Sequence, residues 1–331
     1  MITSVFKKST PINLILVVIL MLVFFFIYQF QDLSWTKSVV SILKTLGLFL
    51  VLLASVFITN FIAKRNGLSK DSGYTVFFYF LFLLFFPSVW NNTDLIASNF
   101  FILLALRRLI SLQSLKATKE KIFDASLWIF VASLFHFWSI LYIILVFISV
   151  IFHVARDYRN WVLPFIAFFA VGIISGGISL VCSKDLLGYI SQNAVFNFNI
   201  DYFTNNYQNI AFSIYITVAL FFVVSMFASL SSKPLLLNSS FKKIIMAFFI
   251  GLLIFVISSN KSNDMLIYTI APLSIMATSH IEVKQLQLKQ ELVLGVLILC
   301  SLFAFFSQLL FISVGQISCI SQSRNDVFFV I

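Results

Sequence analysis

The stretch "DASLWIFVASLFHFWSILYIILVFISVIFHVARDYRN", residues 124–160, decides how the rest of the chain is arranged. It is almost entirely apolar as far as Arg156, with one interruption, "FHFW", at residues 135–138. If the segment crosses a membrane once, its two ends lie on opposite sides. If it turns back at the interruption, its ends lie on the same side. This choice sets the side on which every later loop lies.

The composition is that of an integral membrane protein. Of the 331 residues, 61% are hydrophobic and 10% are charged, whereas a soluble domain is nearer half apolar and a quarter charged. Long apolar runs recur without alternating polar positions, which favours membrane helices over a β-barrel. The predicted apolar segments are residues 12–30, 39–62, 74–90, 95–110, 125–155, 161–181, 210–230, 244–258, 265–279 and 291–314.

The charge and the cysteines exclude several other classes. A net charge of +10 would suggest nucleic acid in a soluble protein. Here the basic residues lie in short loops between apolar runs, a pattern typical of topology signals, so we expect no nucleic-acid partner. The three cysteines form no CxxC pair and have no histidine at zinc spacing. We expect no metal site and no cofactor.

The positions of Lys and Arg favour a hairpin at residues 125–155. These residues prefer the cytoplasmic side of short loops. With a cytoplasmic N-terminus, a hairpin gathers most of the 22 Lys and Arg residues on that side, while a single crossing places many of them outside. The exceptions under the hairpin arrangement are Lys37, Lys44, Lys184, Lys261 and Arg324.

The length of this segment leaves two forms open. Two limbs of about 14 residues would each span roughly 21 Å, against a hydrocarbon core of about 30 Å. The pair is therefore either two short helices in a thinned membrane or a re-entrant segment. We predict an all-α integral membrane protein with about 10–11 transmembrane helices, including this short helical hairpin. Residues 1–331 form a single polytopic domain in the inner membrane, with a longer outer loop at 182–209.

On this topology the polar residues collect on the outer face. The first outer loop is "QFQDLSWTK" and the second is "SVWNNTDL". The loop at 182–209 comes next, and "SSNKSNDM" follows it. Aromatic and amide side chains suit sugars, because rings stack on sugar faces and amides bond hydroxyls. The candidate catalytic residues are Asp32, His136 and Lys261, and the candidate substrate-binding residues are Asn91, Asn92, Asp94, Trp138 and Asp264.

These candidates also have simpler interpretations. Asp94 and Asp264 precede apolar helices, where aspartate is a favoured N-cap. Asp32 is equally a solvated turn residue, and His136 an interfacial histidine. Trp138 fits the aromatic belt of a membrane protein. The sequence shows no Asp, Glu or Arg in the middle of an apolar segment, which argues against an ion-coupled pump.

Three stretches together resemble an uncharacterised family of multi-pass membrane proteins of the Bacteroidota. They are "MITSVFKKSTPINLI", the central run from "NFFILLALRRLISLQS" to "DYRNW", and "KSNDMLIYTIAPLSIM". The hairpin "ASLFHFWSILYII" is also similar to one in membrane polysaccharide polymerases, and the layout to polyprenyl-phosphate-dependent glycosyltransferases. That resemblance implies an acidic catalytic residue in the first outer loop, where Asp32 lies, although the usual acidic pair is absent.

Three functions follow as hypotheses. The first is a lipid-linked sugar glycosyltransferase or polysaccharide polymerase at the outer face. In it Asp32 is the general base and Lys261 or His136 stabilises the phosphate leaving group. The second is a lipid or polyprenol transporter, which needs a polar path between the faces. The third is a non-catalytic subunit of a membrane assembly. The expected partners are membrane lipids and polyprenyl-phosphate-linked sugars.

Overall fold

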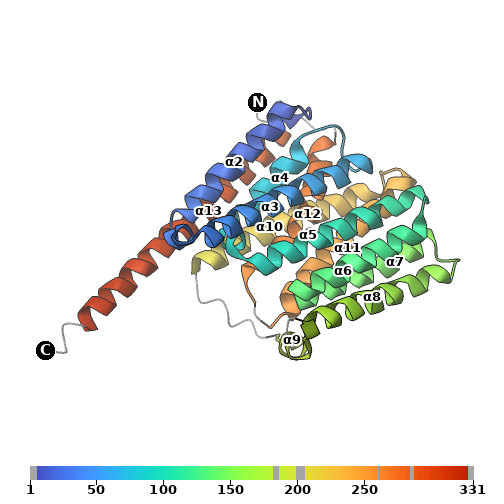
Figure 1. Cartoon of the computed structure of the whole chain (residues 1–331). Coiled ribbons are helices and arrows are strands. Elements are labelled where there is room, and N and C mark those ends of the chain that lie inside the picture. Colours follow the sequence, from blue (N-terminus) through green and yellow to red (C-terminus); the bar gives the residue numbers. More distant parts are fainter. Residues whose placement is uncertain (1–5, 182–185, 199–205, 260, 284–286, 327–331) are drawn as a thin grey trace.

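The computed structural model describes the backbone of residues 6–181, 186–198, 206–259, 261–283 and 287–326. Within these ranges the chain is helical and has no strand, and its helices lie side by side in one bundle (Figure 1). The predicted all-α multi-pass membrane architecture is therefore confirmed. Part of the predicted outer loop at 182–209, with Lys184, Asp185 and Asp201, lies outside the described residues.

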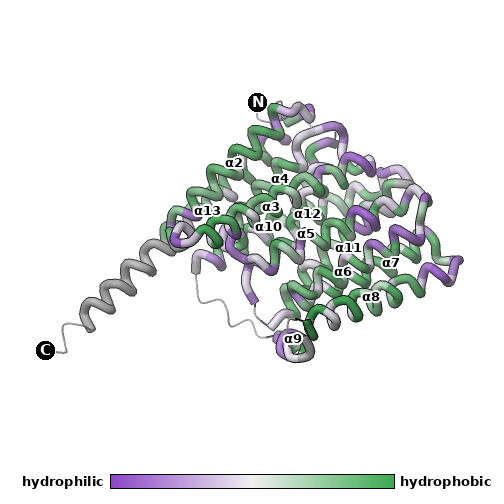
Figure 2. The backbone as a smooth tube through the Cα atoms, viewed as in Figure 1, coloured by the Kyte–Doolittle hydropathy of each residue, from purple (hydrophilic) through white to green (hydrophobic). Residues whose placement is uncertain are grey.

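Seven helices among the described residues are long and apolar enough to cross a membrane. Four others are shorter or more polar and pack among them, so the predicted total of ten to eleven crossings stays a prediction. Figure 2 shows hydrophobic residues along the bundle and hydrophilic residues concentrated towards its ends. The seven are α2 (Pro11–Gln29), α3 (Val39–Arg65), α5 (Thr93–Ile110), α8 (Arg159–Val181), α10 (Asn206–Leu230), α11 (Leu235–Ile257) and α13 (Gln287–Asp326); the four are α4 (Tyr74–Leu83), α6 (Thr118–Phe135), α7 (Ile143–His153) and α12 (Ile267–Glu282).

Short elements join these helices. One is an α-helix, α9 (Leu186–Asn193), which lies inside the segment predicted as the longer outer loop at 182–209. The others are 3-10 segments: η1 (Leu33–Lys37), η2 (Pro87–Asn91), η3 (Ser111–Ser114), η4 (Phe137–Tyr142) and η5 (Asn263–Leu266).

The centre of the bundle is formed by α4 and α12. Every residue of α4 is buried, and so is every residue of α12 as far as Ser279. The buried hydroxyl groups of α12 are hydrogen-bonded within the bundle, as that of Thr278 is to the Thr75 hydroxyl at 3.2 Å. The outer helices instead expose large apolar side chains, among them Ile19, Ile173 and Leu299, which suit contact with lipid chains.

The segment at residues 125–155 forms two antiparallel helical limbs. The first limb is α6, which begins at Thr118 and so takes in the polar residues before Asp124. The second is η4 followed by α7, with 6 and 11 residues. At about 1.5 Å per α-helical residue and about 2.0 Å per 3-10 residue, each limb is roughly 27–29 Å long. The limbs are therefore longer than predicted, and no re-entrant irregular backbone is needed.

Contacts between loops show that both ends of this hairpin lie at the same end of the bundle. The Lys119 amine, in the first turn of α6, lies 3.5 Å from the Asp157 carboxylate, which follows α7. We name this the basic end; it is made of residues 6–10, 64–73, 107–121, 153–160, 230–243 and 279–283. The other end, which we name the cleft end, is made of residues 29–38, 84–94, 136–139, 257–259 and 261–266.

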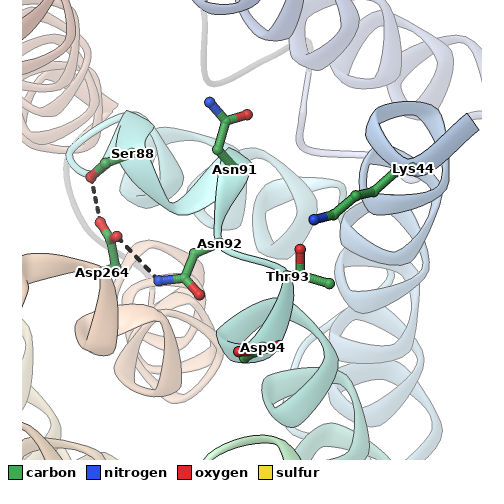
Figure 3. Close-up of a pocket in the computed structure, with 7 residues that line it drawn as sticks. All are labelled: Lys44, Ser88, Asn91, Asn92, Thr93, Asp94 and Asp264. Atoms are coloured by element: carbon green, nitrogen blue, oxygen red, sulfur yellow. Dashed lines mark hydrogen bonds between the residues drawn. The ribbon is translucent and has the colours of Figure 1, made fainter. Parts of the chain in front are cut away.

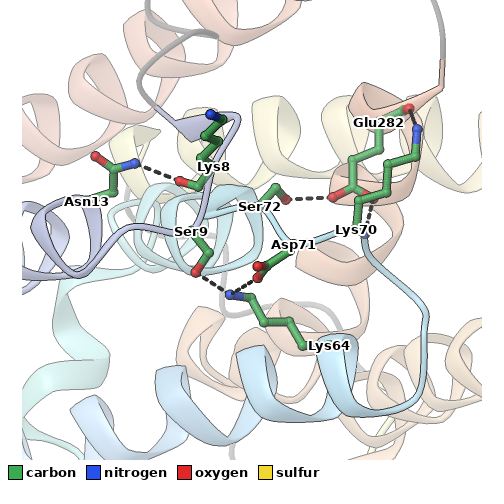
Figure 4. Close-up of polar contacts among 8 residues, drawn as sticks. All are labelled: Lys8, Ser9, Asn13, Lys64, Lys70, Asp71, Ser72 and Glu282. Carbon is green, nitrogen blue, oxygen red and sulfur yellow. Dashed lines mark hydrogen bonds and ion pairs between the residues drawn. The ribbon is translucent and has the colours of Figure 1, made fainter.

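The basic end is tied together by polar contacts between distant segments (Figure 4). The Lys64 amine lies 3.1 Å from the Asp71 carboxylate and also donates to the Ser9 hydroxyl. The Ser72 hydroxyl donates to the Glu282 carboxylate at 2.6 Å. These contacts join the chain before α2, the loop between α3 and α4, and the last residue of α12.

Among the helix boundaries that differ from the predicted ones, two change the placement of polar residues. The segment predicted at 74–90 is helical only to Leu83, because Pro87 cannot donate a helical hydrogen bond and begins η2 instead. The segment predicted to begin at residue 244 begins at Leu235. Lys243, which we predicted to lie in a loop, is therefore inside α11. It is buried, and its amine donates to the Leu109 carbonyl oxygen at 2.6 Å, near the end of α5.

Candidate functional site

An open polar cleft of about 520 Å³ lies at the cleft end of the bundle. Three parts of the chain that are distant in sequence form it: α3, the junction of η2 with the start of α5, and η5 (Figure 3). The helices between the two ends of the bundle are mainly apolar, so the polar groups of the cleft are concentrated at this end. The cleft is lined by Lys44, Ser88, Asn91, Asn92, Thr93, Asp94 and Asp264.

The local sequence explains why η2 and α5 present their polar groups here. After Pro87 the chain forms one 3-10 segment and then the N-terminus of α5. The N-cap of α5 is Asn92, whose side-chain oxygen accepts a hydrogen bond from the Leu95 backbone N–H at 3.3 Å. Asparagine is among the residues most favoured at this position. The neighbouring Asn91 accepts a hydrogen bond from the Gln29 amide at 2.6 Å, which ties η2 to α2.

Asp264 is the buried carboxylate of the cleft. It lies in η5 and is 8% exposed. It accepts a hydrogen bond from the Ser88 hydroxyl and a longer one, 3.5 Å, from the Asn92 amide (Figure 3). Burial raises the pKa of Asp264 above its ordinary value, and the hydrogen bonds from Ser88 and Asn92 oppose this rise. A carboxyl group with a raised pKa in a cleft is a candidate general acid or base.

Lys44 supplies the positive charge of the cleft. It lies in the second turn of α3 and is exposed. Figure 3 shows Lys44 and Asp264 on opposite sides of the cleft, with Asn92 and Thr93 between them. The arrangement therefore offers a cation on one side, a buried acid on the other, and amide and hydroxyl groups in between.

Asp94 adds a second carboxylate at the rim. It lies in the first turn of α5, where a negative charge suits the helix dipole. Its charge also acts on Tyr189 of α9: burial is the main reason that the pKa of Tyr189 is raised, and Asp94 adds to it. The α9 helix thus lies within electrostatic range of the cleft.

The cleft brings together four of the residues predicted from the sequence, namely Asn91, Asn92, Asp94 and Asp264. The simpler interpretation of both aspartates as N-caps is wrong. Asn92 caps α5 two residues before Asp94, and Leu266 occupies the N-cap position of α12.

Two of the predicted catalytic residues lie at the same end but do not line the cleft. Asp32 is exposed in the turn before η1. Its loop is held to other helices, because the Gln31 amide donates to the Leu309 carbonyl oxygen at 2.9 Å and the Trp35 indole to that of Gln29 at 3.1 Å. Lys261 donates to the Asn197 carbonyl oxygen at 2.5 Å, which ties the segment after α9 to the residues just before η5.

His136 and Trp138 lie at the tip of the hairpin and are packed among aromatic rings. The His136 ring is 5.7 Å from the Tyr268 ring, and the Trp138 ring is 4.6 Å from that of Phe196. Burial lowers the pKa of His136 to about 4, so its imidazole is neutral at physiological pH. It would therefore meet a phosphate as a neutral group and not as a cation.

The structure adds Lys44, Ser88 and Thr93 to the cleft, and none of them is among the site residues predicted from the sequence. Lys44 did give a signal, since it is a lysine inside a predicted apolar segment. Ser88 and Thr93 gave none beyond their place beside the two asparagines. Among the described residues, no group of three or more His, Cys, Asp or Glu side chains is placed to hold a metal ion.

The fold and the cleft define the chain as a multi-pass, all-α membrane protein with a polar site at one end of its bundle. Comparison with known families gives a more specific assignment. The model of the family of unknown function DUF6427 matches residues 1–313, and the chain belongs to this family. No curated protein and no solved structure matches the chain.

Proposed function

We propose that the protein is a membrane enzyme that transfers a sugar from a polyprenyl-phosphate-linked donor, as a glycosyltransferase or polysaccharide polymerase. One observation carries this proposal: the buried carboxylate of Asp264 and the amine of Lys44 lie on opposite sides of a cleft that is lined by amides and hydroxyls. Sugar transfer from a phosphate-linked donor needs these same kinds of group: a base for the acceptor hydroxyl, a cation for the phosphate, and hydrogen-bonding groups for the sugar.

Each group has a role in this reaction. Asp264 in its ionised form accepts the proton of the acceptor hydroxyl as the hydroxyl oxygen bonds to the anomeric carbon. The bond from that carbon to the phosphate oxygen breaks, and polyprenyl phosphate leaves with the electron pair. Lys44 bonds the leaving phosphate, and Asn91 and Asn92 bond sugar hydroxyls. The apolar surface of the bundle keeps the polyprenyl chain in the membrane beside the cleft.

The proposal also includes an orientation. Because Lys and Arg favour the cytoplasmic side, the basic end and the N-terminus face the cytoplasm of a cell with an inner membrane. The cleft end then faces the outer side, where lipid-linked sugars are assembled into surface glycans. Asp32 and Lys261 lie at this same end but outside the residues that line the cleft, so the proposal gives them no step in the transfer.

A transporter is less well supported, because polar groups around the central α12 helix are already bonded to each other. The Tyr268 hydroxyl donates to the Ser98 hydroxyl at 2.8 Å, and the Tyr215 hydroxyl lies 2.6 Å from that of Thr269. A path for a polar head group would have to break these buried contacts, each of which costs free energy in an apolar interior.

Lys44→Gln tests the proposed transfer. The substitution removes a charged hydrogen bond to the phosphate, worth about 1.5–3 kcal/mol, so we expect transfer to slow about 10- to 100-fold. In cells, polyprenyl-phosphate-linked sugars should accumulate as they do when the gene is deleted, as measured by mass spectrometry of lipid extracts.

Lys37→Gln is the matched control, since Lys37 is also an exposed lysine of the cleft end but does not line the cleft. It should leave the lipid-linked sugars at the wild-type level. If deletion causes accumulation but Lys44→Gln does not, the cleft is not the catalytic site, and a non-catalytic subunit becomes the better interpretation. If deletion itself leaves these lipids unchanged, the proposed function is wrong.

A further inference from the structure

A second pocket, of about 270 Å³, lies at the basic end of the bundle, away from the cleft. It is bordered by the loop between α3 and α4, the loop between α10 and α11, and the C-terminus of α12. Its polar lining includes Lys70, Lys233, Ser69, Ser279 and Glu282.

Lys233 is the cation best placed to bind a ligand in this pocket. It is half-buried, its amine donates to the Ser279 hydroxyl at 2.7 Å, and its charge lies 4.9 Å from the centre of the Phe241 ring. An ammonium group has three N–H donors, and the described contacts use one of them for a hydrogen bond. The Ser69 hydroxyl, also in the lining, is buried and has no hydrogen-bond partner among the described residues.

The negative group of the pocket, the Glu282 carboxylate, already accepts hydrogen bonds from neighbouring protein groups. Both carboxylate oxygens of Glu282 accept hydrogen bonds, one from the Lys70 backbone N–H at 2.8 Å and one from the Ser72 hydroxyl at 2.6 Å. The Lys70 amine donates to the Glu282 backbone carbonyl oxygen at 2.9 Å (Figure 4). With two lysines and one glutamate, the pocket keeps a net positive charge.

The remaining wall of the pocket is apolar. Leu68, Leu237, Phe241 and Val283 line it beside the lysines. A pocket with cations on one side and hydrocarbon on the other suits an amphiphile, whose anionic group contacts the lysines while its chain contacts the apolar wall. Basic pockets between membrane helices are a known means of binding anionic lipid head groups.

We infer that this pocket binds the phosphate group of an anionic lipid in the leaflet at the basic end, with Lys233 as the principal contact. Lys70 contributes positive charge and Ser69 a hydroxyl donor. This inference does not depend on the proposed sugar transfer, because it concerns the other end of the bundle and a different set of residues.

The test measures lipid binding to the purified full-length protein in detergent. Dioleoylphosphatidylglycerol, dioleoylphosphatidylcholine and inorganic phosphate are titrated separately, and the shift of the thermal unfolding midpoint gives an apparent Kd for each. We expect the anionic lipid to bind wild-type protein at least about tenfold more tightly than the zwitterionic lipid. Lys233→Gln should weaken binding of the anionic lipid about tenfold, since it removes one charged hydrogen bond.

Two further variants separate binding from folding. Lys233→Arg keeps the charge and should keep the preference for the anionic lipid. Lys242→Gln removes an exposed lysine at the same end that does not line the pocket, and it should bind as the wild type does. The inference is overturned if the wild type shows no preference, or if Lys242→Gln loses as much binding as Lys233→Gln. If inorganic phosphate alone stabilises the protein through Lys233, the ligand is a soluble phosphate compound and the assignment to a lipid is wrong.

Discussion

Asp264→Asn is expected to slow sugar transfer about 10²- to 10⁴-fold, the usual contribution of a general base. Asparagine has nearly the same shape and can keep hydrogen bonds to Ser88 and Asn92, but it cannot take the proton of the acceptor. A strain that carries only this variant should therefore accumulate polyprenyl-phosphate-linked sugars, and its surface glycan should decrease. The measurement is mass spectrometry of lipid extracts together with the amount of surface glycan.

Asp264→Asn should slow transfer without destabilising the folded protein. Burial raises the pKa of Asp264 in the folded protein above its value in the unfolded chain. The folded state therefore binds the proton more tightly, and its stability decreases as the pH rises between these two pKa values. At neutral pH the neutral asparagine should keep or raise the thermal unfolding midpoint. Asp71→Asn, at an exposed aspartate of the basic end, is the control and should leave transfer unchanged.

The same shift predicts the pH dependence of transfer. The base works only when ionised, so activity falls as the pH drops through the pKa of Asp264. Because that pKa is raised, the acid limb of the rate profile of the purified enzyme should lie above pH 3.8, the ordinary aspartate value. An acid limb at or below that value would contradict the assignment of Asp264 as the base.

Gly251→Leu is expected to cause the largest loss of stability, about 3 kcal/mol. Gly251 lies in α11 where this helix crosses α12, and a Cβ atom there would lie 2.9 Å from the Thr269 methyl carbon. It would also lie 3.2 Å from the Tyr268 carbonyl carbon, which is backbone and cannot rotate away. Overpacking of a well-packed interior typically costs about 1–3 kcal/mol, and a leucine adds three more carbon atoms.

The effect should extend to the cleft, since α12 directly follows η5, which carries Asp264. The thermal unfolding midpoint in detergent measures the loss, and Gly177→Leu in α8 is the matched control. A Cβ atom at Gly177 meets nothing within 4 Å, so a leucine there should be neutral or slightly stabilising. Equal midpoints for the two variants would show that α11 and α12 do not pack as closely as described.

The architecture was predictable because hydrophobicity and charge act over many residues at once. Apolar runs identified the helices, and the distribution of Lys and Arg identified the hairpin at residues 125–155. Helix limits were less predictable, since polar residues such as Thr118 and Asn238 are helical at the ends of the bundle. Only Pro87 gave a local reason for an early helix end, and the prediction did not use it.

The candidate site was predictable only in part. The asparagines and aspartates of two predicted outer loops do meet, because both loops lie at the same end of the bundle. The presence of Lys44 in the cleft depends on how α3 packs beside η2, which no local pattern reveals. The same limit explains why Asp32 and Trp138 were predicted as site residues. They lie at the correct end of the bundle but outside the residues that line the cleft.

The most direct measurement is the labelling of single cysteines from outside intact cells with a membrane-impermeant maleimide. Asn91→Cys places the label at the exposed rim of the cleft, and Asp157→Cys places it at the basic end, in a chain without Cys182, Cys300 and Cys319. If the two ends lie on opposite sides with the cleft outside, residue 91 reacts in intact cells and residue 157 reacts only after the cells are broken. Labelling of both positions in intact cells, or of residue 157 alone, would contradict the hairpin topology or the outward-facing cleft.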